Sequence, residues 1–324
     1  NVAVSKQPDG SYQYNEIGQP TPNEDPWAQF PFERTYTEWK LSAFANGGVD
    51  MRGRFGGEGV TVISTCQDCH MPKAEGKACN IGPPRPDAAK HDFAGGAAPV
   101  LDLIAEHYKD DPNVELDAIA AAKAKSISML ERAASLEIDQ QCGSLHVRVY
   151  NETGHKLPTG HIEGRRVWVN VALRDSSGNV IHEYGHYDTD EAHLDTDSTE
   201  VYEMKVGLSE QAAEATGLEP GVTVHMALAD TIMKDNRIPP RGFDNETYAQ
   251  GGAPAVGEIY ADGQYWNDSY FSVDDQAASA VVNVYYQNLP RHYIEALRDG
   301  NVTDHWGTRC TSSENPRVAG HRSK

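Results

Sequence analysis

The spacing of apolar residues divides the chain into two regions with different patterns. Between residues 98 and 136, apolar side chains such as Val100 and Leu103 recur every three or four positions, which is the spacing of one buried helix face. Residues 110–112 (Asp-Asp-Pro) interrupt this run, and proline is disfavoured inside a helix. The pattern therefore predicts two consecutive helices, and residues 35–45 predict one short helix nearer the N-terminus.

After residue 143 the period of the pattern changes to two. Alternation of apolar and polar residues is typical of strands with one buried face. Five segments alternate in this way: 145–150, 166–174, 180–186, 222–228 and 280–286. The sequence DSSGN between the second and third segments is a turn signal. We therefore predict antiparallel strands that form a β-sandwich.

Together these patterns predict the α+β class. We expect a loop-rich segment with a helical pair over residues 1–140, followed by an antiparallel β-sandwich with long loops over residues 141–324. Gly (29 residues) and Pro (18 residues) are abundant, as expected of a chain with many turns and short strands. No run of about 18 apolar residues occurs, so we expect no membrane span.

The net charge of −20 narrows the class of partner. Nucleic acids and anionic membrane surfaces bind basic proteins, so neither is an expected partner of this acidic chain. The acidic surface also keeps a protein soluble whether or not it binds a partner. The chain begins with Asn1 instead of Met, which we interpret as the sign of a processed or truncated chain that has lost a leader or a longer segment.

The most informative motif is TCQDCHMP, in which Cys66, Cys69 and His70 form the pattern C-x-x-C-H. This pattern is the attachment signature of c-type haem. Two thiols three positions apart can each add to one vinyl group of a porphyrin, and the adjacent imidazole can then bind the iron. The sequence therefore predicts one haem c, with Cys66 and Cys69 as its anchors and His70 as the proximal ligand.

Paired cysteines also occur in two other kinds of site. A thioredoxin-like redox pair lies in a βαβ unit, and a zinc site needs two further ligands at close spacing; neither pattern is visible here. The remaining cysteines, Cys79, Cys142 and Cys310, allow at most one disulfide, and the pair is left open. Because haem c is attached outside the cytoplasm, where disulfides persist, we expect a periplasmic or extracellular protein.

The second axial ligand decides what the haem iron does. An iron with six ligands exchanges electrons, whereas an iron with five ligands has room for a small molecule. Of the 13 histidines, His91 in KHDFAGG and His155 in ETGHKLPTG lie in stiff turns, and His107 and His161 rank below them. We expect a low-spin haem bound by His70 and His91, with His155 as the alternative distal ligand. Loop histidines bonded to backbone carbonyls are the other interpretation of both turns.

A series of motifs in the same order resembles bacterial multihaem c-type cytochromes. The series is CQDCHMP, HDFAGG, NETGHKLPTGHIEGRRVWVNVALRDSSGNV, KDNRIPPRGF, YADGQYW, VYYQN and YIEALRD, and it extends from about residue 35 to residue 299. The resemblance implies an exported electron-transfer protein with a haem-bearing segment and a β-sandwich. It also implies that His91 is an axial ligand, and that His155 is the alternative ligand or faces a neighbouring haem.

The chain departs from that family in having a single C-x-x-C-H motif. Since one haem cannot form a relay, we expect other haem proteins as electron donor and acceptor, in an oligomer or a complex with other cytochrome chains. One-electron transfer is the expected function in preference to catalysis. Two other functions stay open: a haem enzyme or small-ligand sensor with an open distal site, and a structural surface subunit in which haem holds the fold together.

Two consecutive arginines are candidates for contact with the haem propionates. Arg165 and Arg166 open the segment RRVWVNVALR, and a guanidinium matches the geometry of a carboxylate. Ordinary salt bridges at the end of a strand are the alternative. No nucleophile-elbow, P-loop or dinucleotide-binding motif occurs, so conventional hydrolase or nucleotide chemistry has no support in the sequence.

An acidic cluster lies in the sequence DTDEAHLDTD. Dense carboxylates at alternate positions can bind Ca²⁺ through their oxygen atoms, although the twelve-residue EF-hand pattern is missing. The cluster predicts a calcium site formed by Asp188, Asp190, Asp195 and Asp197, with Glu191 beside them. A solvated acidic loop is the alternative.

Overall fold

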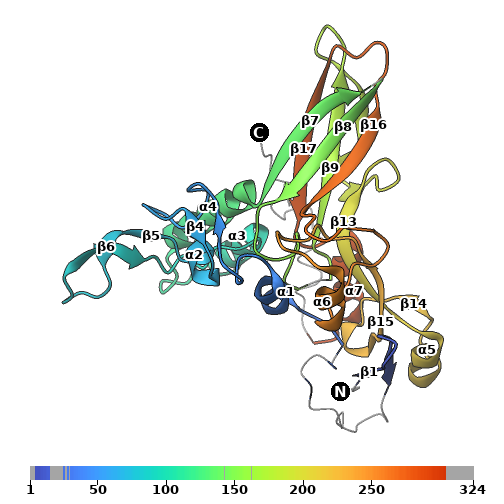
Figure 1. The fold of residues 1–324 in the computed structure, drawn as a ribbon, viewed down its shortest axis with the longest axis horizontal. Helices are drawn as coiled ribbons and strands as arrows, with labels where there is room; N and C mark the ends of the chain where they lie inside the picture. The colour runs from blue at the N-terminus through green and yellow to red at the C-terminus, as the bar shows by residue number, and fades with distance from the viewer. Residues whose placement is uncertain are drawn as a thin grey trace.

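The computed structural model describes residues 4–14, 25, 28, 30–141, 143–161 and 163–303. Two antiparallel sheets form the centre of the molecule, and a helical, loop-rich region lies beside one end of them (Figure 1). The α+β class that the sequence predicts is confirmed. Within the described ranges, no helix is both long and apolar enough to cross a bilayer.

The smaller central sheet has the strand order β16-β8-β7 and the larger one the order β10-β9-β13-β14, with β17 paired to β9 and β15 paired to β13. All of these pairings are antiparallel. The strands are β7 (Ala134–Gln141), β8 (Ser144–Asn151), β9 (Arg166–Arg174), β10 (Val180–Tyr184), β13 (Val201–Leu208), β14 (Gly221–Val222), β15 (Thr231–Asp235), β16 (Trp266–Ser272) and β17 (Ser279–Gln287).

A single hydrophobic cluster joins the two sheets. Val147 and Val149 of β8 contribute to it from the smaller sheet, and Val169 and Val171 of β9 contribute from the larger one; all four are fully buried. Their spacing of two follows from the alternation of side chains along a strand. β9 is central because β17 pairs along its whole length while β10 and β13 pair with its two halves.

The N-terminal region contains helices and short strands, which lie beside the lower end of the sheets in Figure 1. It contains a small core of its own, made by Phe44, Met51, Phe55 and Ile63. The β5–β6 hairpin extends away from this region, at the left of Figure 1. The elements are β1 (Val4–Lys6), β2 (Tyr12–Tyr14), α1 (Thr35–Leu41), β3 (Val49–Asp50), β4 (Val62–Ile63), α2 (Cys66–His70), β5 (Lys73–Lys77), β6 (Pro84–Ala89), α3 (Ala98–His107) and α4 (Leu116–Ala133).

The remaining short elements lie between or after the strands of the larger sheet along the chain. They are β11 (Tyr187–Asp188), β12 (His193–Leu194), α5 (Glu210–Thr216), the 3₁₀ helix η1 (Met226–Leu228), α6 (Asn245–Gln250) and α7 (Arg291–Gly300). Of these, α6 bears on the site, because it packs against α1 and its Tyr248 donates a hydrogen bond to the Glu38 carbonyl.

Most of the periodic segments form the elements that their pattern predicts. The helical pair is confirmed as α3 and α4, although residues 134–136 belong to β7, and α1 confirms the short helix. Four alternating segments lie on β8, β9, β10 and β17. The strand predicted over residues 222–228 is wrong, because only Gly221–Val222 pairs and Met226–Leu228 is a 3₁₀ helix. The Met226 side chain is partly buried against the cluster that contains Val206. This buried apolar residue of the 3₁₀ helix produces the same sequence pattern as the buried face of a strand.

Candidate haem-binding site

The C-x-x-C-H motif forms the short helix α2, and its first turn is closed by a capping box. The Thr65 hydroxyl accepts a hydrogen bond from the Asp68 amide at 3.2 Å. The Asp68 carboxylate in turn accepts from the amides of Thr65, at 2.8 Å, and Ser64, at 3.0 Å. Such reciprocal bonds satisfy amides that a helix start leaves without partners. The cap therefore fixes a helix that is too short to be stable alone.

Both motif cysteines and His70 lie in the lining of one cavity of about 510 Å³. Ligand sites in proteins typically have volumes of about 300–1,000 Å³ and mostly apolar walls. The apolar lining comes from α1, the small N-terminal core, α4 and the loop after β8: Trp39, Phe44, Phe55, Ile63, Met129, Leu130 and Leu157. Cys69 and His70 also border a second cavity, of about 340 Å³, on the side of α4. The volume and the apolar walls suit a large, flat, hydrophobic group.

The His70 ring is held by the backbone of the segment that follows the β5–β6 hairpin. Its Nδ1–H donates to the Ala94 carbonyl at 2.6 Å, and the Phe93 amide donates to the His70 carbonyl at 2.9 Å. With Nδ1 protonated, Nε2 carries the lone pair, and Nε2 has no hydrogen-bond partner among the described residues. An Nδ1–H bonded to a carbonyl is the usual arrangement of a histidine that ligates a metal through Nε2.

His155 lies in the same cavity lining, in the loop between β8 and β9. Its Nδ1–H donates to the Lys156 carbonyl at 3.1 Å, with the Thr153 hydroxyl 3.2 Å away. Asn151 Nδ2 and the Thr153 hydroxyl both donate to the His155 carbonyl, at 2.7 and 2.8 Å. Burial lowers the pKa of His155, so the imidazole is neutral at pH 7 and its Nε2 can act as a ligand.

His91 lies outside this lining. Its side chain is exposed, and its ring packs beside that of Phe93 with 5.7 Å between the ring centres. The adjacent Asp92 forms an ion pair with Lys125 of α4 at 2.6 Å. Neither His107 nor His161 lines the cavity. The structure thus brings His70 and His155 together and leaves His91 at the surface.

The two consecutive arginines point in different directions. Arg165 lines the cavity and donates a hydrogen bond to the Thr159 carbonyl. Its guanidinium lies against Gly160, where any Cβ atom would collide with it. Arg166 is buried on the other side of β9, where its Nε donates to Gln287 Oε1 at 2.7 Å. Only Arg165 is available to a group in the cavity.

Tyr286 of β17 is a lining residue that lies in the motif VYYQN but is not among the predicted site residues. Its hydroxyl donates to Asn288 Oδ1 at 2.9 Å, and burial raises its pKa to about 12. The alternation over residues 280–286 contains a signal for it, since Tyr286 shares a strand face with the core residue Val284. The lining residues Trp39 and Phe44 have no comparable signal, because they lie in a helix end and a loop.

The two motif cysteines are free thiols that differ in exposure, with Cys66 exposed and Cys69 partly buried. Burial raises the pKa of the Cys69 thiol to about 12. Cys79 is an exposed free thiol, and Cys142 and Cys310 lie outside the described residues, as does any disulfide that they form. The Cys69 thiol lies in the apolar wall of the cavity, where it can serve as a haem anchor.

The acidic cluster is arranged as backbone turns. Asp188 Oδ1 accepts from the amides of Asp190 and Glu191, at 2.8 and 3.0 Å, and Asp195 Oδ2 accepts from the Ser198 hydroxyl at 2.6 Å. In the part of the chain that the structure describes, no group of three or more His, Cys, Asp or Glu side chains is arranged to hold a metal ion. The structure gives no support to calcium binding by Asp188, Asp190, Asp195 and Asp197.

No protein-family model matches the chain, and no curated protein shows significant sequence similarity to it. Among solved structures, the chain is similar to the crystal structure of a penta-heme cytochrome c552 from Thermochromatium tepidum, with a TM-score of 0.48 and 16% sequence identity. The match covers 93% of this chain and 51% of that chain. The chain therefore spans about half the length of that cytochrome.

Proposed function

We propose that this chain is an exported c-type cytochrome that carries one covalently bound haem and transfers single electrons within a larger cytochrome assembly. The observation that carries this proposal is the apolar cavity lined by Cys66, Cys69, His70 and His155. A C-x-x-C-H motif that faced solvent or a packed core would leave no room for a porphyrin. Here both thiols and two imidazoles border the same space.

The residues of the chain divide the work of holding the haem. Cys66 and Cys69 would carry the thioether bonds, and Nε2 of His70 would bind the iron on the proximal side. When bound, the haem supplies one Fe(III)/Fe(II) couple, whose potential depends on ligands, burial and nearby hydrogen bonds. Aromatic and aliphatic side chains of the lining would pack against the porphyrin, and Arg165 would pair with a propionate.

We propose His155, and not His91, as the distal ligand. Both His70 and His155 line the cavity, and each uses Nδ1–H to bind a backbone carbonyl, so that each offers Nε2. Two such ligands would fill both axial positions of the iron. An iron bound by both histidines would have no open position for a small molecule. This arrangement supports electron transfer in preference to an enzyme or sensor with an open iron site.

The proposed partners are other haem proteins. The sequence contains one C-x-x-C-H motif, so a relay of electrons through this chain needs redox centres on other chains. Export to the periplasm or beyond the cell is part of the proposal, because haem is attached to cysteines outside the cytoplasm.

Replacement of each candidate histidine tests the ligand assignment. The wild-type ferric protein should be low-spin by EPR, and His155→Ala should convert it to a high-spin form that binds cyanide. His91→Ala is the matched control, and it should stay low-spin because that ring is exposed and outside the cavity lining. A high-spin His91→Ala protein together with a low-spin His155→Ala protein would contradict the assignment.

A further inference from the structure

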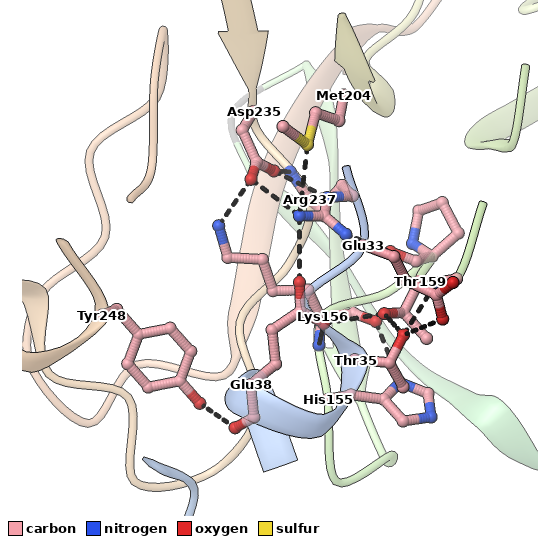
Figure 2. A network of polar contacts seen from close by, with 12 residues as sticks. Glu33, Thr35, Glu38, His155, Lys156, Thr159, Met204, Asp235, Arg237 and Tyr248 are labelled. Atoms are coloured by element: carbon pink, nitrogen blue, oxygen red, sulfur yellow. Dashed lines mark hydrogen bonds and ion pairs between the residues drawn. The ribbon is translucent and has the colours of Figure 1, made fainter. Parts of the chain in front are cut away.

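Four charged side chains are buried together behind the loop that carries His155 (Figure 2). Glu38, Lys156 and Asp235 have side chains that are at most 1% exposed, and that of Arg237 is 4% exposed. Lys156 Nζ pairs with Asp235 Oδ2 at 2.8 Å, Arg237 Nε pairs with Asp235 Oδ1 at 2.8 Å, and Arg237 Nη2 pairs with Glu38 Oε1 at 3.0 Å. The two positive and two negative charges balance.

The burial of charged side chains costs free energy, so we expect this network to have a structural role. Taking ions out of water costs several kcal/mol for each ion, and a well-packed apolar cluster is often at least as stable. Stability alone is therefore a weak explanation for four of them. The network contacts the loop that carries His155.

Glu38 holds the backbone immediately after His155. Its Oε2 accepts from the Lys156 amide at 3.1 Å and from the Thr159 hydroxyl at 2.7 Å. Arg237 Nη1 adds a longer hydrogen bond to the Pro158 carbonyl, at 3.3 Å. The network thus contacts three of the four residues that follow His155 and restrains the direction in which its ring points.

Helix α1, which carries Glu38, also contacts the segment that leads into α2 on the other side of the cavity. Trp39, next to Glu38 in α1, donates from Nε1 to the Ser64 carbonyl at 2.9 Å, and Ser64 directly precedes the capping residue of α2. Tyr248 of α6 fixes α1 itself through the 2.7 Å hydrogen bond from its hydroxyl to the Glu38 carbonyl. Adjacent residues of one helix therefore reach the His70 segment and the His155 loop.

We propose that Glu38 is a positioning residue for His155, and that α1 sets the distance between His155 and His70 through Glu38 and Trp39. The inference rests on the proposed function, because it assigns Glu38 to the distal ligand of that site. Glu38 does not line the cavity, so it acts through the loop and not on the haem. A carboxylate is needed because one oxygen must accept two hydrogen bonds while the other faces Arg237.

Glu38→Gln tests this inference, because it keeps the shape of the side chain but replaces one oxygen by a donor. The ferric holoprotein should become partly high-spin, and cyanide should bind roughly tenfold faster or more than to wild type, since hydrogen bonds to a charged group are lost from the loop. Added imidazole should restore the low-spin spectrum. Hydrogen exchange of the segment 152–161 should accelerate as well, which reports on the loop independently of the haem.

A matched control separates positioning from a general loss of stability. Glu203 is also a buried carboxylate, but it pairs with Lys205 and Lys234 on β13 and β15. Glu203→Gln should leave the spectrum, cyanide binding and exchange of 152–161 unchanged. If Glu38→Gln fails to fold, Thr159→Val takes its place, because it removes one of the two hydrogen bonds at Glu38 Oε2 and should accelerate cyanide binding several-fold.

The outcomes distinguish this inference from the proposed function. A low-spin wild type with a folded Glu38→Gln variant that matches it in spectrum and cyanide binding would overturn the inference alone. Equal rates for Thr159→Val and wild type would do the same. A wild-type protein that is high-spin, or that lacks covalent haem, would overturn the proposed function and the inference with it.

Discussion

At the scale of single residues, His91 and His155 differ in exposure: the His91 side chain is exposed, whereas the His155 side chain lines the cavity. His91 and His155 both lie in Gly-containing turns, and His91 is much nearer to His70 along the chain. The loop that carries His155 nevertheless lines the cavity, and the His155 ring is held there by its hydrogen bond to the Lys156 carbonyl. A sequence pattern cannot supply this information, because the loop and the motif meet only in the tertiary structure.

The contact between Gly160 and Arg165 gives a prediction at this scale. Gly160 has φ +88°, and a Cβ atom there would overlap the Arg165 guanidinium. Gly160→Ala should cost more free energy of unfolding than Gly178→Ala, which has φ +85° and nothing within 4 Å of its Cβ position. The left-handed backbone alone costs about 1–2 kcal/mol at both sites. Urea unfolding measures the difference, and equal losses would show that Arg165 is not held where the structure places it.

At the scale of elements, strands with clear alternation are predictable and strands with polar sequences are not. β9 and β17 alternate well because one face of each packs into the shared core. β16 has the sequence WNDSYFS, in which only Asn267 and Phe271 are buried, so its apolar pattern is weak. β7 follows α4 without a Gly or Pro between them, and no local signal separates the helix from the strand.

The cap of α2 gives a prediction at the scale of elements. Thr65→Ala removes the hydroxyl that accepts from the Asp68 amide, and the loss of an N-cap costs about 1 kcal/mol. Ser209→Ala removes the corresponding hydroxyl of α5, which accepts from the Ala212 amide. Ser209→Ala also removes the hydrogen bond from this hydroxyl to the buried Asp230 carboxylate, so it should lose at least as much unfolding free energy. Even so, only Thr65→Ala should lower the yield of haem-loaded protein. An equal fall in haem content for Ser209→Ala would remove the link between this cap and the site.

At the scale of the whole molecule, the structure is two antiparallel sheets with a helical region beside one end, which contains a cavity of about 510 Å³. The walls of that cavity come from α1, α2, α4, the loop after β8 and Tyr286 of β17, so residues far apart in the chain must fold together to form it. The α+β class and the attachment motif follow from the sequence, since both depend on local patterns. The part of the cavity lined by His155 depends on contacts between distant segments, which local patterns do not contain.

The central claim, that Cys66 and Cys69 tether one haem in this cavity, is tested most directly by the mass of the denatured protein. The intact chain, expressed with export and haem attachment, should have the mass of the polypeptide plus one haem, and it should keep peroxidase activity on a denaturing gel. The double variant Cys66→Ser/Cys69→Ser should lose both signals, whereas Cys79→Ser, at an exposed cysteine outside the cavity lining, should keep them. A wild-type mass equal to that of the bare polypeptide under these conditions would contradict the account.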